Sequence, residues 1–320
     1  MPDPEADGSG EAPQAEGDAM AGSDTGGVDP VDGGVPVAEE EPPPEMERPD
    51  AGGAAEHPRD PRTLEAGCLA DVDAYFEPGP FDHQETETGR IRILVPEVPA
   101  GCKVPMIHFS TGTGAPCENY GDVLRGLAGH GFLTLCYEGG TTGDGSHGVQ
   151  AFETALAEYP ELADLRFGLA GHGAGGQGAF VGQQLSEARW GAQGVYAGFG
   201  AAPESGFGTQ PEGGTWSEVY AEVRAPVFMF SGDPSDGLVS MRWVQQGFGA
   251  FDDGTEAYHF SRTDLVHIPV PQGVVLQLAV PWFRWKLLGD QDACRALMSI
   301  PEMDDEWLLA DSHGEVPCGD

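Results

Sequence analysis

Three positions in the second half of the chain have the order of a nucleophile, an acid and a histidine, but the nucleophile is missing. Residues 171–175 (Gly-His-Gly-Ala-Gly) match the spacing of G-x-S-x-G, in which a strained strand-to-helix turn presents a serine, and here Gly173 occupies the serine position. Asp236 and His267 follow in later loops, with room for one helix and one strand between them. In such a site the acid orients the imidazole, and the imidazole deprotonates the nucleophile. Taken singly, Asp236 could cap a turn and His267 could be a packed imidazole, so their order behind the turn is what favours a site.

The sequence offers two alternatives to the missing serine hydroxyl as a nucleophile. Ser110, in an earlier loop, or Ser235, beside Asp236, could act as a substitute nucleophile, although neither stands on the turn. Alternatively, His267 could activate a water in the space that the serine would fill, which would give slow hydrolysis.

The elements around these positions alternate between strands and helices. A buried strand at 167–170 leads into the glycine-rich turn, and a helix follows at 179–185. We expect further strands at 90–95, 104–109, 132–137, 194–199, 226–231 and 256–261, and helices at 120–128, 149–159, 216–223, 241–251 and 272–288. This alternation predicts an α/β fold with a mostly parallel sheet covered by helices on both faces, and with the first exposed strands pairing antiparallel at its edge.

The charge of the chain is strongly negative, −38 over 320 residues. Residues 1–67 hold 18 acidic and 3 basic residues and no Phe, Trp or Tyr, so we expect a disordered acidic tail followed by one folded domain at 68–320. The acidic excess argues against nucleic acid and anionic membranes as partners. No stretch is long and apolar enough to span a membrane, and no signal region follows Met1. The composition favours export with a signal not seen in this chain, and a cytoplasmic protein is the alternative.

Six cysteines are present, without a C-x-x-C pair, so we expect no metal site. An even number suits an exported protein with disulfide-linked loops, and buried thiols are the competing interpretation. Cys136, inside the apolar stretch 132–137, fits a buried thiol better.

Residues 104–267 resemble the α/β-hydrolase superfamily, most closely cutinases, polyester (PET) hydrolases and related bacterial lipases. The resemblance rests on the loop at 110–115 and on residues 127–132 (Leu-Ala-Gly-His-Gly-Phe, where the family has Leu-Ala-x-His-Gly-Phe). It also rests on the turn at 171–175, which corresponds to the family's nucleophile elbow, and on Asp236 and His267 after it. It implies an oxyanion hole from the backbone N–H groups of Thr113 and Ala174, and a C-terminal disulfide between Cys294 and Cys318. It also implies a small-molecule or polymeric ester-like ligand and no cofactor.

Gly173 is the departure from this family that matters most for function, because acyl transfer needs a side-chain oxygen there. The sequence therefore predicts an ester-hydrolase framework with lost or very low activity, a pseudoenzyme. The alternative is an active ester hydrolase that uses a substitute nucleophile or a water activated by His267. A remote alternative is a nucleotide site, since Gly171, Gly173 and Gly176 satisfy G-x-G-x-x-G. That motif expects an acidic residue at the end of the next strand, and 194–199 lacks one.

Overall fold

The computed structural model describes residues 75–139, 143–203, 216–232, 241–268, 271–303, 306–313 and 318. The tail predicted at 1–67 lies outside the described residues, and so do Asp236 and Ser235.

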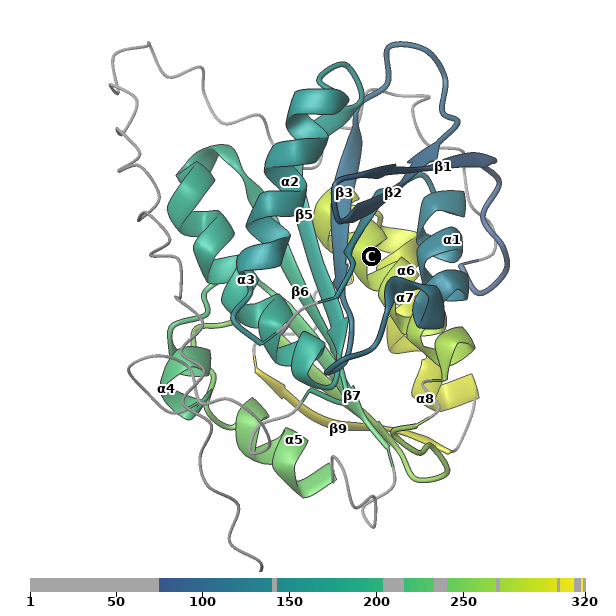
Figure 1. The fold of residues 1–320 in the computed structure, drawn as a ribbon. Helices are drawn as coiled ribbons and strands as arrows, with labels where there is room; N and C mark the ends of the chain where they lie inside the picture. The colour runs from purple at the N-terminus through teal and green to yellow at the C-terminus, as the bar shows by residue number, and fades with distance from the viewer. Residues whose placement is uncertain are drawn as a thin grey trace, which may run out of the picture. The chain divides into compact units, whose positions relative to one another are not determined.

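The described residues build one mixed, mostly parallel sheet of nine strands in the order β1-β2-β4-β3-β5-β6-β7-β8-β9 (Figure 1). Neighbouring strands from β4 to β8 run parallel, whereas β1 pairs antiparallel with β2, β2 with β4, and β9 with β8. The antiparallel edge predicted for the first strands is therefore confirmed. The strands are β1 (His83–Thr88), β2 (Ile91–Pro96), β3 (Val104–Ser110), β4 (Leu133–Tyr137), β5 (Ala163–His172), β6 (Val195–Ala201), β7 (Val227–Ser231), β8 (Ala257–Arg262) and β9 (Trp307–His313).

Helices cover both faces of the sheet, as predicted. Helices α2 and α3 pack together on one face, and α1, α6 and α7 form a connected layer on the other (Figure 1). The helices are α1 (Gly121–Gly129), α2 (Ser146–Glu158), α3 (Ala174–Trp190), α4 (Trp216–Ala221), α5 (Met241–Phe248), α6 (Gln272–Leu288), α7 (Gln291–Met298) and α8 (Ile300–Met303), with short 3-10 helices η1 (Cys117–Tyr120) and η2 (Gly191–Gln193). Among the described helices, none combines the length and the apolar character that crossing a membrane requires.

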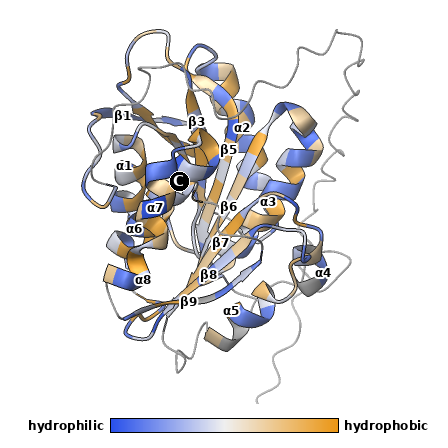
Figure 2. Ribbon diagram, turned by 180° about the vertical axis from the view of Figure 1, so that it is seen from behind, coloured by the Kyte–Doolittle hydropathy of each residue, from blue (hydrophilic) through white to orange (hydrophobic). Residues whose placement is uncertain are grey.

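The core is built from strands that are buried on both sides, which is why they read as apolar runs rather than as alternating patterns. Every residue of β3 is buried, and alternate side chains pack into different clusters. Phe109 packs toward the α1 and α6 layer, whereas Met106 packs toward α2 and α3. Figure 2 shows orange and pale colours on the central strands, and both orange and blue on the surrounding helices.

Four of the strands and α-helices were not predicted. Strand β1 consists of polar residues that pair with β2 at the sheet edge and stay largely exposed, so no apolar pattern announces it. Helices α7 and α8 and strand β9 form a C-terminal segment that returns to pair with β8. Pairing with a distant strand stabilises β9, and such a contact leaves no local pattern in the sequence.

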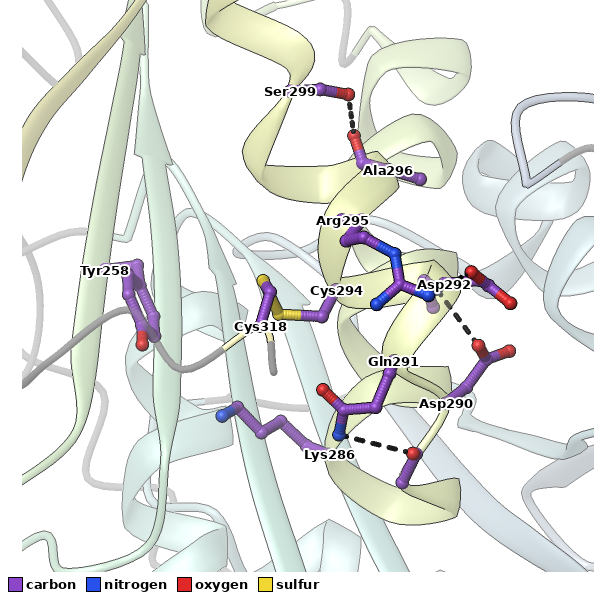
Figure 3. The surroundings of a disulfide bond; sticks show 12 residues. Tyr258, Lys286, Asp290, Gln291, Asp292, Cys294, Arg295, Ala296, Ser299 and Cys318 are labelled. Atoms are coloured by element: carbon purple, nitrogen blue, oxygen red, sulfur yellow. Dashed lines mark hydrogen bonds and ion pairs between the residues drawn. A yellow bond between two sulfur atoms is a disulfide. The ribbon is translucent and has the colours of Figure 1, made fainter. Parts of the chain in front are cut away.

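The described cysteines form disulfides rather than free thiols. Cys117 is bonded to Cys136, which corrects the thiol interpretation of Cys136, and Cys294 is bonded to Cys318. Cys102 is disulfide-bonded too, and none of the described cysteines is free. The strand position of Cys136 misled the prediction because its partner lies on η1, far enough along the chain to give no spacing signal. Figure 3 shows Cys318 held against Cys294 of α7, close to Lys286 and Tyr258.

Replacing both Cys294 and Cys318 by alanine should lower the free energy of unfolding by about 3 kcal/mol. The disulfide closes a loop with a sequence separation of 24, and removing it returns that loop's entropy to the unfolded chain. Urea unfolding under non-reducing conditions measures the loss. Equal stability of the double variant and the wild type would contradict this expectation.

Candidate functional site

Gly173 occupies a sharp turn between the end of β5 and the start of α3. Its φ is 58° and its ψ is −125°, a backbone conformation that residues with a Cβ adopt only at a cost in strain. The Gly173 N–H donates to the carbonyl of Ala201 on β6 at 3.0 Å, and its own carbonyl accepts from the Gly176 N–H at 2.9 Å. The strand–turn–helix predicted from residues 171–175 is thus confirmed, with a glycine at the apex.

The helix that follows the turn packs unusually close to the sheet. A Cβ on Gly171 would lie 2.1 Å from the Gly175 carbonyl oxygen, and a Cβ on Gly175 would lie 2.1 Å from the Ser110 carbonyl oxygen and 2.4 Å from that of Thr111. Only glycine fits at either position. This approach places the start of α3 directly against the loop that follows β3, so two loops at the carboxyl ends of adjacent parallel strands meet.

Gly175→Ala should therefore destabilise the fold by about 3 kcal/mol, because backbone atoms and not a flexible side chain stand in the way. Gly273→Ala is a matched control, since a Cβ there meets nothing within 4 Å and α6 gains a better helix former. Thermal unfolding of both variants measures the difference. If Gly175→Ala is as stable as Gly273→Ala, the close packing of α3 is wrong.

His267 lies beside the turn. Its imidazole stacks on that of His172, the residue before Gly173, with ring centroids 4.3 Å apart and planes inclined by 27°. Both histidines are more than nine-tenths buried. The loop after β8 thus brings His267 beside the turn at Gly173, whereas the predicted orienting acid, Asp236, lies outside the described residues.

The two amides predicted to form an oxyanion hole lie on the two loops that meet here. Ala174 is the first residue of α3, so its N–H belongs to the amides that have no acceptor within the helix. Thr113 lies in the exposed turn after β3, where the Ala115 N–H donates to the Gly112 carbonyl at 3.0 Å. The neighbouring amide of Gly112 is already engaged, because it donates to the Tyr120 hydroxyl at 2.9 Å.

A small cleft opens beside the two histidines. Two residues next to His267 carry exposed apolar side chains, Val266 at 53% and Ile268 at 66% exposure. The cleft is lined by His172, Ala202, Phe230, Gly232, Leu265, Val266, His267 and Pro271. The described walls of the cleft thus combine apolar side chains with the two imidazoles. Among the residues that the structure describes, no group of three or more His, Cys, Asp or Glu is placed to hold a metal ion.

Ser110, one of the two substitute nucleophiles, is directed elsewhere. Its hydroxyl lies 3.3 Å from Nδ1 of His108, two residues earlier on the same strand, and the two side chains share a face. His108 contacts Phe152 of α2, so this face is the one covered by α2 and α3. His172, in contrast, contacts Tyr120, which packs on Phe109 toward the opposite layer. The other candidate, Ser235, lies outside the described residues.

Tyr120 is the residue that the sequence prediction missed. It lies at the end of η1, is 3% exposed, and its hydroxyl contacts both the Gly112 amide and the His172 imidazole. A lone tyrosine ahead of a helix has no spacing that would single it out. Only the meeting of η1, the loop after β3 and the elbow gives it a role.

No protein-family model matches this chain, and no curated protein sequence matches it.

Proposed function

We propose that this chain is an α/β-hydrolase of the cutinase and lipase type that has lost most or all of its ester-hydrolysing activity and that binds an ester-like ligand in the cleft beside Gly173. The observation that carries the proposal is the backbone of Gly173, at φ 58° and ψ −125° between β5 and α3, with His267 stacked on the residue before it. A turn of this kind holds the serine nucleophile in that superfamily.

The proposed roles follow from the chemistry of each group. Ala174 and Thr113 would donate backbone N–H groups to the carbonyl oxygen of the ligand, a contribution of roughly 3 to 4 kcal/mol per donor in working enzymes. His267 would stand where the general base stands, oriented by Asp236. Because Gly173 has no side chain, no acyl-enzyme can form there, and a bound ester stays intact. The exposed apolar side chains of Val266 and Ile268 suit the hydrocarbon part of such a ligand.

The test is to restore the missing hydroxyl. Wild-type protein should hydrolyse p-nitrophenyl butyrate at or near the background rate, and Gly173→Ser should hydrolyse it far faster. The rival mechanism, a water activated by His267, predicts measurable wild-type turnover that His267→Ala abolishes. Wild-type turnover that His267→Ala leaves unchanged would contradict both.

A further inference from the structure

The Tyr120 hydroxyl joins three segments that are distant in the sequence. It accepts a hydrogen bond from the Gly112 N–H at 2.9 Å and lies 3.1 Å from Nδ1 of His172. Gly112 belongs to the loop after β3, and His172 is the last residue of β5. One phenol thus connects the loop that carries Thr113 with the turn that carries Gly173.

The direction of these hydrogen bonds follows from counting protons. A backbone N–H can only donate, so the Tyr120 oxygen accepts from Gly112. The hydroxyl has one proton of its own, it is buried, and Nδ1 of His172 is the acceptor within its reach. Burial raises the pKa of Tyr120, and the Gly112 hydrogen bond offsets this only in part, so the phenol keeps its proton at neutral pH. Nδ1 of His172 therefore accepts, and neutral His172 carries its proton on Nε2.

We propose that Tyr120 is a positioning residue that holds His172 in the Nε2–H tautomer and fixes the loop of Gly112 and Thr113 against the elbow. The inference deepens the proposed function, on which it rests, because the ring that Tyr120 holds lines the cleft and supports the imidazole of His267. With His172 fixed in tautomer and tilt, the stacked His267 keeps its place beside Gly173. With Gly112 tied down, the Thr113 amide keeps its direction.

Tyr120 is itself held on two sides. Its ring packs on Phe109 with centroids 5.0 Å apart. The η1 turn that carries it is bonded to β4 through Cys117 and Cys136, and the Cys117 N–H donates to the Glu138 carboxylate at 3.2 Å. A residue that only filled space would not need its hydroxyl aligned with two partners. A residue that sets the tautomer of a neighbouring histidine must itself be held in a fixed position, as Tyr120 is here.

The first experiment reads the tautomer directly, without any activity. In ¹⁵N NMR spectra of the wild type, His172 should show a proton-free Nδ1 and a protonated Nε2. Tyr120→Phe, which keeps the ring and removes the hydroxyl, should turn His172 into a mixture of tautomers and speed hydrogen exchange at the Gly112 amide. Tyr196→Phe is the matched control, because it removes another buried phenol hydroxyl that binds the Ser186 and Gly191 carbonyls. A proton on Nδ1 of His172 in the wild type, or no change in either signal in Tyr120→Phe, would overturn the proposal.

The second experiment places Tyr120→Phe in the Gly173→Ser background. There we expect kcat for p-nitrophenyl butyrate to fall by on the order of 10- to 100-fold with KM little changed, because misplaced groups affect the chemical step more than binding. Tyr196→Phe in the same background should leave kcat within about twofold. An unchanged kcat in the Tyr120 variant of an active Gly173→Ser enzyme counts against the positioning role. If Gly173→Ser is inactive, the proposed function fails, and the NMR result still decides the role of Tyr120.

Discussion

Gly173→Ser should hydrolyse p-nitrophenyl butyrate at least about 1000-fold faster than the wild type. In a serine hydrolase, loss of the nucleophile alone costs about a million-fold in kcat, so under the proposed function a serine at residue 173 should recover a large part of that factor. Residue 173 has φ 58° and ψ −125°, and His267 lies beside this turn. The same backbone predicts a cost in stability of about 1 to 3 kcal/mol, because a residue with a Cβ is strained there.

Gly173→Ala is the matched control for this gain. It brings the same Cβ and the same strain but no hydroxyl, so it should lose stability like the serine variant and stay inactive. Adding His267→Ala to Gly173→Ser should return activity to near background, because the serine then has no base. A serine variant that folds and remains as inactive as the alanine variant would rule out an intact hydrolase site around residue 173.

The folded protein should lose stability steeply between pH 6.5 and about pH 4. Burial lowers the pKa of His108 to about 3, and burial lowers the pKa of His259 to about 4 against the opposing charge of Asp311. Below pH 6.5 the unfolded chain takes up a proton at each histidine, whereas the folded protein does not. Since the unfolded state then binds more protons, stability falls as the pH falls, by about 1.4 kcal/mol per pH unit for each histidine. Urea titration at pH 7, 6, 5 and 4.5 measures the free energy of unfolding, to whose slope the two histidines contribute in this direction.

A variant distinguishes the contribution of His108 to the pH dependence from the contribution of the other charged groups. With 53 acidic residues, acidification also relieves repulsion between carboxylates, and this acts in the opposite direction. His108→Gln should reduce the slope by about 1.4 kcal/mol per pH unit relative to the wild type. Parallel slopes for the wild type and His108→Gln would show that His108 takes up its proton in the folded state.

Much of the scaffold could be predicted from the sequence because its signals are local. The apolar runs of β3, β4, β6, β7 and β8 reflect burial on both faces of the sheet. The apolar spacing of α1 and the long apolar stretch of α6 can likewise be recognised within their own segments of the sequence. The glycine density at residues 171–176 pointed to the turn as well, although the carbonyl that excludes a side chain at Gly175 belongs to Ser110 on another strand. Positive φ at Gly173 disfavours a side chain there, and neighbouring backbone atoms leave no room for one at Gly171 and Gly175.

The tertiary structure decided the features that depend on partners far along the chain. Strand β9 exists because β8 offers it hydrogen bonds, and Cys136 is in a disulfide because η1 brings Cys117 to it. The chain order predicted that His267 would lie near the turn, but it did not predict that the imidazole would stack on His172. The role of Tyr120 was not implied at all, since its hydroxyl gains its partners only where three loops meet.

The sequence by itself determined the α/β alternation, the glycine turn and the absence of a side-chain nucleophile at position 173, because each is written in residues that are neighbours in the chain. The tertiary structure alone decided that His267 stacks on His172 beside that turn, that the Tyr120 hydroxyl contacts His172, and that Ser110 belongs to the opposite face. The physical reason is that hydrogen bonds and ring contacts between loops act over a few ångströms in space and have no fixed spacing along the chain.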